Sequence, residues 1–199
     1  MIDNLELIKP LLNFVEKGDF YMLYILKRKK DQPESERDNH QSVRTIKTYC
    51  VDSLDYLDKR WEEIKMLCEV FKARAYIHIQ KQNHFDVSLE MMVELAQRIK
   101  NDVNNQKGLF DSVVGKIKTL EKRWIVDIDS KNEDYINSVL KLINSLNPIE
   151  NKLISKIPTK SGFHLITRKF DLSEFSKKYP EIDVQKKNPT LLFLPNSLI

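Results

Sequence analysis

The 199-residue chain is 41% hydrophobic and 31% charged and carries a net charge of +4, which excludes a wholly disordered chain and permits a polyanionic partner without defining one. Cys50 and Cys68 lie far apart and form no Cys-x-x-Cys pattern, which excludes a Cys-rich zinc knuckle and a disulfide framework. No apolar run approaches the ~20 residues of a membrane span and no signal core follows the N-terminus, so we expect a cytoplasmic protein without membrane contact.

The first 120 residues alternate between helical and strand-like patterns. Apolar residues at helical spacing stop at Gly18, and an aromatic and β-branched run then leads into the basic cluster Lys27 to Lys30. The polar segment 31–42 carries Pro33 and no apolar face, which predicts a mobile loop. The predicted elements are a helix over 4–18, strands over 19–30 and 43–51, a helix over 53–72, a strand over 73–82 and a helix over 88–102. Together they predict an N-terminal α/β lobe over 1–120.

The remaining residues predict a second, smaller lobe. The Asn- and Lys-rich stretch 101–108 predicts a connection, and a short amphipathic segment follows it up to Leu120. The predicted elements beyond it are a strand over 124–128, a helix over 133–146, two strands around a turn within 152–170, a short helix over 173–178 and a strand over 190–195. This order, β-α-β-β-α-β, is that of RRM-like and ferredoxin-like folds. The sequence therefore predicts a single α+β unit over 1–199, with an RRM-like lobe over 121–199.

A pair of carboxylates lies at the end of an apolar strand, in "WIVDID". Side chains two residues apart in a strand point the same way, so Asp127 and Asp129 share one face. Two like charges at this separation repel each other unless a cation lies between them, and a divalent metal ion is the simplest candidate. The alternative is structural: Ser130 and Glu133 fit a helix-capping box, and the acids then cap the strand end or meet a lysine.

A second polar cluster lies in "PTKSGFHLITRKF". Gly162 allows a close backbone approach to a ligand, Ser161 and the neighbouring amides can donate to phosphate oxygens, and Lys160 supplies a positive charge. In a strand that begins near Gly162, His164 and Arg168 project on one face and can both meet a polyphosphate. The alternative is that His164 is a hydrogen-bonded structural residue.

A third acid, Asp183, follows an apolar residue and precedes the apolar strand Leu191 to Leu194. It is either a third metal ligand or a turn carboxylate in a surface connection. Basic side chains for a nucleic-acid strand are expected in the N-terminal lobe, where the alternative is a solvated run of charge. They are Arg28, Lys29, Lys30, Arg44, Arg74 and His78.

At these three places the chain resembles the archaeo-eukaryotic primase superfamily, and in particular small stand-alone primase-polymerases of plasmids and phages. The resemblance rests on D-x-D at Asp127 and Asp129, on the Ser-Gly turn followed by His164, and on "EID" with "LFLPNSL" around Asp183. It covers about 122–199 and matches the preceding lobe more loosely. Two positions depart from the family pattern: Phe193 stands where Arg is frequent, and Asn196 replaces Gly.

The resemblance implies a two-lobed primase-polymerase fold and a site that holds two Mg²⁺ or Mn²⁺ ions. Asp127, Asp129 and Asp183 would be the catalytic, metal-binding acids. The phosphates of a nucleoside triphosphate would be bound by Lys160, Ser161, Gly162 and His164, assisted by Arg168. The implied partners are a DNA or RNA template and, in replication, a helicase or an initiation protein.

We therefore expect a metal-dependent nucleotidyltransferase that adds nucleotides on a template. The alternative is a primase-fold accessory protein of replication that binds nucleic acid without catalysis. A sugar-nucleotide transferase or a phosphohydrolase would use the D-x-D but would not explain the K-S-G-x-H turn. The preference for ribo- or deoxynucleotides and the use of a primer stay open.

Overall fold

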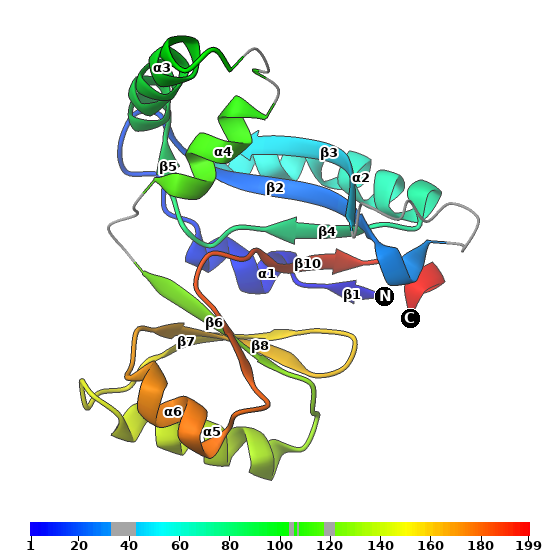
Figure 1. Ribbon diagram of the computed structural model, residues 1–199. Helices are drawn as coiled ribbons and strands as arrows, with labels where there is room; N and C mark the ends of the chain where they lie inside the picture. The colour runs from blue at the N-terminus through cyan, green and yellow to red at the C-terminus, as the bar shows by residue number, and fades with distance from the viewer. Residues whose placement is uncertain (33–42, 104–105, 107, 118–121) are drawn as a thin grey trace.

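A computed structural model describes residues 1–32, 43–103, 106, 108–117 and 122–199 of the chain (Figure 1). It contains two antiparallel sheets and six α-helices, which confirms the α+β class. The predicted loop over 31–42 lies outside the described residues from position 33 onward. Parts of the predicted connection over 101–108 and the last residues of the amphipathic segment that ends at Leu120 also lie outside them. No helix among the described residues is long and apolar enough to cross a membrane.

The first sheet has the strand order β1-β10-β4-β2-β3, and β5 pairs with the beginning of β2. Its strands are β1 (Ile2–Asp3), β2 (Asp19–Arg28), β3 (Val43–Val51), β4 (Arg74–Ile77), β5 (Gln82–Asn83) and β10 (Thr190–Leu194). Alternation along β2 sends Leu23 and Ile25 into a core shared with helix α2 (Leu54–Phe71), and Met22 toward α3 (His84–Lys100) and α4 (Leu109–Lys116). Beyond Met22, the second face of β2 is free to line a site.

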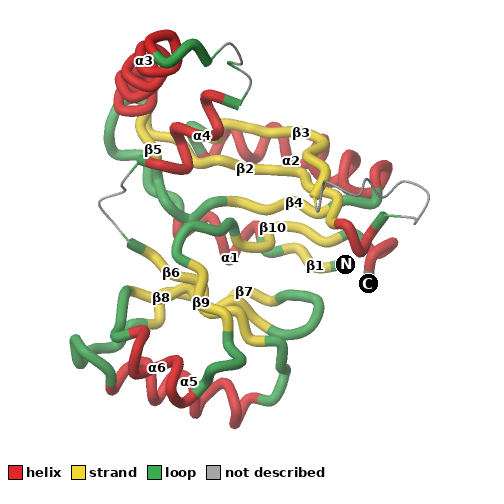
Figure 2. The backbone as a smooth tube through the Cα atoms, in the orientation of Figure 1, coloured by secondary structure: helices red, strands yellow, loops and turns green. Residues whose placement is uncertain are grey.

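The second sheet has the order β7-β8-β6-β9 and is covered on one face by two helices (Figure 2). Its elements are β6 (Arg123–Ile128), α5 (Glu133–Ser145), β7 (Leu153–Pro158), β8 (Phe163–Arg168), α6 (Leu172–Lys178) and β9 (Asp183–Gln185). Val126 and Ile128 pack toward α5 and α6, whereas Ile125 joins the core of the first sheet. The chain order of these elements is β-α-β-β-α-β, but its last strand is β9, where the sequence analysis predicts no strand, and not the predicted 190–195.

The last long strand differs from the prediction. The sequence places 190–195 in the second lobe, but β10 pairs antiparallel with β4 and β1 in the first sheet. All five of its residues are buried, which suits an apolar strand inside a sheet, and its pairing partners are far away in the sequence. The chain therefore enters the second sheet at β6 and returns to the first at β10.

Several element boundaries also differ. The N-terminal helix is short: α1 (Leu5–Ile8) passes into a 3-10 turn (Lys9–Leu11) that contains Pro10, since proline cannot continue the hydrogen-bond ladder. Helix α3 begins at His84, four residues before the predicted start, because the Asn83 side chain accepts a hydrogen bond from the Phe85 amide at 2.9 Å.

Candidate active site

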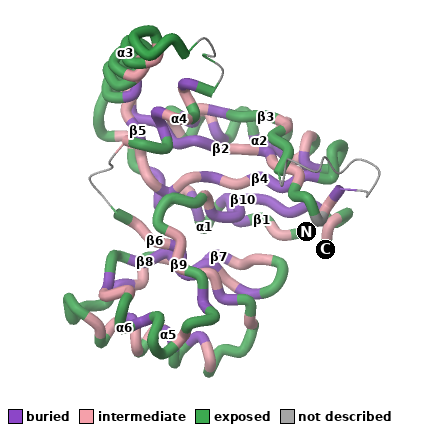
Figure 3. Tube along the Cα trace, in the orientation of Figure 1, coloured by how far each residue is buried: buried purple, intermediate pink, exposed green. Residues whose placement is uncertain are grey.

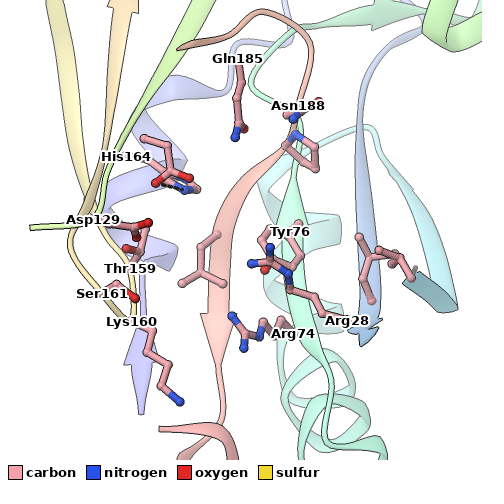
Figure 4. Close-up of a pocket in the computed structure, with 15 residues that line it drawn as sticks. Arg28, Arg74, Tyr76, Asp129, Thr159, Lys160, Ser161, His164, Gln185 and Asn188 are labelled. Carbon is pink, nitrogen blue, oxygen red and sulfur yellow. Dashed lines mark ion pairs between the residues drawn. The ribbon is translucent and has the colours of Figure 1, made fainter. Parts of the chain in front are cut away.

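A cleft of about 300 Å³ lies where the second sheet meets the first (Figure 4). It brings together seven of the residues singled out in the sequence, from five different strands and turns. From the second sheet they are Asp127, Asp129, Lys160, Ser161 and His164, and from the first sheet Arg28 and Arg74. The acids therefore lie on one wall of the cleft and the two arginines on the other.

The acidic wall is built by the end of β6. Ile125 and Asp127 point toward the first sheet while Val126 and Ile128 point into the core under the helices, so the strand alternates as predicted. Asp129 follows the last strand residue and is exposed, whereas Asp127 is half-buried. Both carboxylates line the same cleft.

His164 lies beside the first carboxylate. It stands directly opposite Asp127 in the pairing of β8 with β6, and its Nε2 lies 3.5 Å from Asp127 Oδ1. Its Nδ1 lies 2.9 Å from the Thr190 hydroxyl of β10. Burial lowers the pKa of His164 to about 4, so the imidazole is neutral at neutral pH. The tautomer that fits both contacts carries its proton on Nε2, which points toward Asp127, and accepts a hydrogen bond from the Thr190 hydroxyl at Nδ1.

Asp183 is the third predicted acid, and it stands opposite Asp127 on the other neighbouring strand, β9. It does not line the cleft; instead its Oδ2 accepts a hydrogen bond from Gln185 Nε2 at 2.7 Å, and the Gln185 side chain lines the cleft. Among the described residues, no group of three His, Cys, Asp or Glu side chains is arranged to hold a metal ion. Two carboxylates, rather than three, are thus available to a cation in the cleft.

The turn between β7 and β8 closes the acidic wall. The Thr159 amide donates to the Gly162 carbonyl at 2.8 Å, and the Gly162 amide donates to Thr159 Oγ1 at 3.1 Å. A Cβ atom on Gly162 would lie 1.9 Å from the Ile128 carbonyl oxygen. A close backbone approach is therefore made at this glycine to the end of β6, and Thr159 and Ser161 of the turn lie on the same wall as Asp129 (Figure 4).

The basic wall is anchored in the first sheet. Arg74 is 4% exposed, and its Nη2 lies 2.7 Å from Asp31 Oδ1. Its Nε is buried and has no hydrogen-bond partner within the described residues. Arg28 is exposed at the cleft edge, and Tyr76 lies between the two arginines and β10 (Figure 4). Asp31 Oδ2, on the partner carboxylate, is likewise buried without a hydrogen-bond partner among the described residues. The wall therefore carries one guanidinium fixed by an ion pair and one that is exposed.

Other predicted residues lie elsewhere. Arg168 is at the far end of β8 and contacts Glu150 at 3.3 Å, and Arg44 lines a separate groove with Lys27. His78 packs against Tyr24 near α4, and burial lowers its pKa to about 4. Lys29 is exposed in a 3-10 turn; the side chain of Lys30 lies outside the described part of the structure.

The capping box considered for the carboxylate strand is wrong. Helix α5 is capped by Asn132, whose side chain accepts from the Tyr135 amide at 3.2 Å. Glu133 instead forms an ion pair with Lys156 at 2.8 Å. The helix start therefore does not use Asp127 or Asp129.

Several cleft residues were not singled out as site residues from the sequence, among them the polar Thr159, Gln185 and Asn188. Thr159 stands directly before the K-S-G turn, and a polar residue there is a usable signal because it can fix the turn. Gln185 and Asn188 flank the basic pair before β10, and nothing in their local pattern marks them.

No protein-family model matches the chain, and comparisons with curated proteins and with solved structures give no match. The cleft is therefore the feature of the molecule that bears on its function.

Proposed function

We propose that the cleft is the active site of a metal-dependent nucleotidyltransferase of the primase-polymerase type, which adds nucleotides on a DNA or RNA template. The observation that carries the proposal is the arrangement of charge: two carboxylates and a Ser-Gly turn face two arginines across one cleft. A nucleoside triphosphate with a divalent cation needs such a pairing, since the cation and the phosphates require opposite charges.

The residues fit a cation that is bound jointly with a substrate. Mg²⁺ is usually held by one or two carboxylates plus phosphates and waters, rather than by a complete protein cage. Asp127 and Asp129 supply the two carboxylates, and Asp183 would contribute only if Gln185 released it. Bound there, Mg²⁺ or Mn²⁺ would polarise the α-phosphate and lower the pKa of an attacking hydroxyl.

The chain's own side chains would orient the triphosphate. Arg74, fixed by Asp31, would add its positive charge to the wall of the cleft, and Arg28 is exposed at the edge for a direct contact with the phosphates or with the template. On the opposite wall, the Ser161 hydroxyl would donate a hydrogen bond to a phosphate oxygen. Lys160 would reach the phosphates by exchanging its 2.6 Å hydrogen bond to the Leu198 carbonyl.

His164 would act as a neutral positioning group. Its contacts with Thr190 and Asp127 join β10 to the acidic strand and hold the carboxylate toward the cleft. Because burial keeps the imidazole uncharged, it adds no second cation beside the metal ligand.

The test is a gel assay with labelled ribo- and deoxynucleotides, a single-stranded template with and without a primer, and Mg²⁺ or Mn²⁺. Asp127→Asn/Asp129→Asn should abolish product at an unchanged melting temperature, because the change preserves shape and removes charge. Arg28→Gln should reduce product, whereas Arg168→Gln, a matched change outside the cleft, should not. Equal product from wild type and the double Asn variant would refute the proposal.

The non-catalytic accessory protein is the second candidate. One observation favours it: the Asp183 carboxylate does not line the cleft and accepts a hydrogen bond from Gln185. That candidate predicts no product with either metal and template binding that Arg28→Gln weakens. It also predicts that Asp127→Asn/Asp129→Asn binds template as well as or better than wild type, because repulsive charge is removed.

A further inference from the structure

Helix α3 turns an apolar stripe toward solvent. Five large apolar side chains of the stripe are between 44% and 68% exposed, and the small Ala96 is exposed with them. The stripe, in order, is Phe85, Leu89, Met92, Ala96 and Ile99 on α3, with Val103 just beyond the end of the helix. Two more apolar residues, Val93 and Leu95, flank its middle and are 50% and 37% exposed. Figure 3 shows α3 almost wholly exposed, on the side of the first sheet away from the second.

The opposite face of the helix already has its partner. Val87 is buried and Met91 is half-buried against a cluster that includes residues of α4. Further along the same face, the Glu94 carboxylate accepts hydrogen bonds from Arg98 at 3.3 Å and from Lys116 at 2.9 Å. The inward face therefore changes from apolar to charged, whereas the outward stripe stays apolar along its whole length. A helix of a monomeric globular protein normally has the reverse arrangement.

The spacing of the stripe specifies what can cover it. Its residues recur at alternating intervals of four and three, the pattern that lets one helix pack knobs into the holes of another. We propose that the stripe is a homodimer interface, in which α3 of one copy packs antiparallel against α3 of a second copy about a two-fold axis level with Glu94.

The antiparallel pairing is self-complementary in volume. It layers Leu89 on Ile99 of the second copy and the long Met92 on the small Ala96, and it brings Phe85 to the end of the second helix. A two-fold interface requires this property, because each side of the patch must fit the same patch rotated. On one side of the axis Val93 contacts Val93 of the second copy, and on the other side Leu95 contacts Leu95 of the second copy. The centre of the interface is therefore apolar throughout.

Charge favours the same orientation. Asp86 and Glu90 lie in the first half of α3, and Arg98 and Lys100 in the second half. Antiparallel packing sets Asp86 of each copy beside Lys100 of the other, one such pair at each end of the interface. It also aligns the two helix dipoles in opposite directions, which is favourable. Parallel packing would set acidic half beside acidic half.

The stripe and its two flanking residues are also large enough. They expose on the order of 500 Å² of contiguous apolar surface, comparable with the largest patch on a typical monomer and approaching the ~800 Å² per partner of a stable interface. Polar residues around them would add the rim. The dimer leaves the cleft open, since α3 lies at the end of the first sheet where β2 begins and pairs with β5, whereas the cleft lies at the end where β2 finishes at Arg28 (Figure 1).

The experiment is sedimentation velocity over a wide concentration range, with the full chain. We expect the wild type to reach twice the chain mass of 23.6 kDa. Leu89→Glu/Ile99→Glu should weaken dimerisation by at least about 30-fold, the effect of one strong interface side chain. The control Gln97→Glu, on the same helix but off the stripe, should stay dimeric. At a concentration where the wild type is monomeric, all three proteins should melt alike.

A charge exchange tests the orientation. Asp86→Lys should weaken the dimer by setting Lys beside Lys100 of the second copy, and Asp86→Lys/Lys100→Asp should restore it. A wild type that stays monomeric at all concentrations, or a dimer that the double Glu variant does not weaken, would overturn the proposal. A dimer that the charge exchange fails to restore would overturn the antiparallel pairing.

Discussion

The Gly162→Ala substitution tests the link between the K-S-G turn and the carboxylate strand. A Cβ atom at this position would lie 1.9 Å from the Ile128 carbonyl oxygen and 2.6 Å and 2.8 Å from the backbone N and O of Ser130. All three neighbours are backbone atoms, so no side-chain rotation can relieve the overlap. Either the turn or the end of β6 must move by more than 1 Å, as judged from ordinary contact distances of about 3.5 Å.

The expected cost is at the upper end of overpacking effects, roughly 3 kcal/mol. For a chain of this length, that cost lowers the melting temperature by about 6 to 12 °C. The displacement also separates Ser161 from Asp129, so nucleotidyl transfer should fall by more than the loss of folded protein explains.

Thermal unfolding followed by circular dichroism measures the first effect, and the template assay below the melting range measures the second. Gly115→Ala is the matched control, because a Cβ there has nothing within 4 Å and the residue lies in α4. Alanine should be neutral or stabilise that helix by up to about 1 kcal/mol. A Gly162→Ala protein that melts within 2 °C of the wild type, by the same scale of about 2 to 4 °C per kcal/mol, would refute the reasoning.

Three further changes test buried charges. Lys152, just before β7, is fully buried and donates to the Ile143 and Leu146 carbonyls at 2.8 and 2.9 Å. Lys152→Met should therefore cost about 2 to 4 kcal/mol in urea unfolding, whereas Lys141→Met, at an exposed position of α5, should cost little. Asp31→Leu leaves Arg74 buried without its partner and should cost about 3 to 5 kcal/mol, more than Asp31→Leu/Arg74→Met in the same double-mutant cycle. The pKa of His164 falls from 6.5 to about 4 on folding, so between these two pH values the unfolded state binds one more proton than the folded state. The free energy of unfolding of the metal-free protein should therefore drop by about 3 kcal/mol as the pH falls from 6.5 to 4. His164→Gln should remove that part of the pH dependence.

Local patterns in the sequence predict the acidic wall well, because they depend on one strand. Two-residue periodicity is enough to set Asp127 and Asp129 toward the same cleft, and an apolar alternate such as Val126 toward the core. The same logic correctly puts His164 and Arg168 on one face of β8, but it gives no position along the strand. Arg168 lies four residues beyond His164 along β8, which takes Arg168 out of the cleft.

Features that depend on contacts distant in sequence are not predictable in this way. Gly162 is recognisable as a close-approach residue, but its neighbour, the Ile128 carbonyl, is set by how β8 pairs with β6. The Ser130 and Glu133 spacing matches a capping box, yet Asn132 competes for the same role and makes the bond. Strand β10 carries no local signal for its sheet, because an apolar run fits either core.

The return of β10 also explains the departure at Phe193 from the pattern that the sequence resembles. A bulge between Leu191 and Phe193 changes the register against β4. Leu191 lines the cleft, whereas Phe193 is buried against α2, with its ring 5.8 Å from that of Trp61. An arginine at 193 would therefore enter an apolar core, not the cleft. In the proposed site, the cations of that wall come instead from β2 and β4, as Arg28 and Arg74, so Phe193 is compatible with phosphate binding.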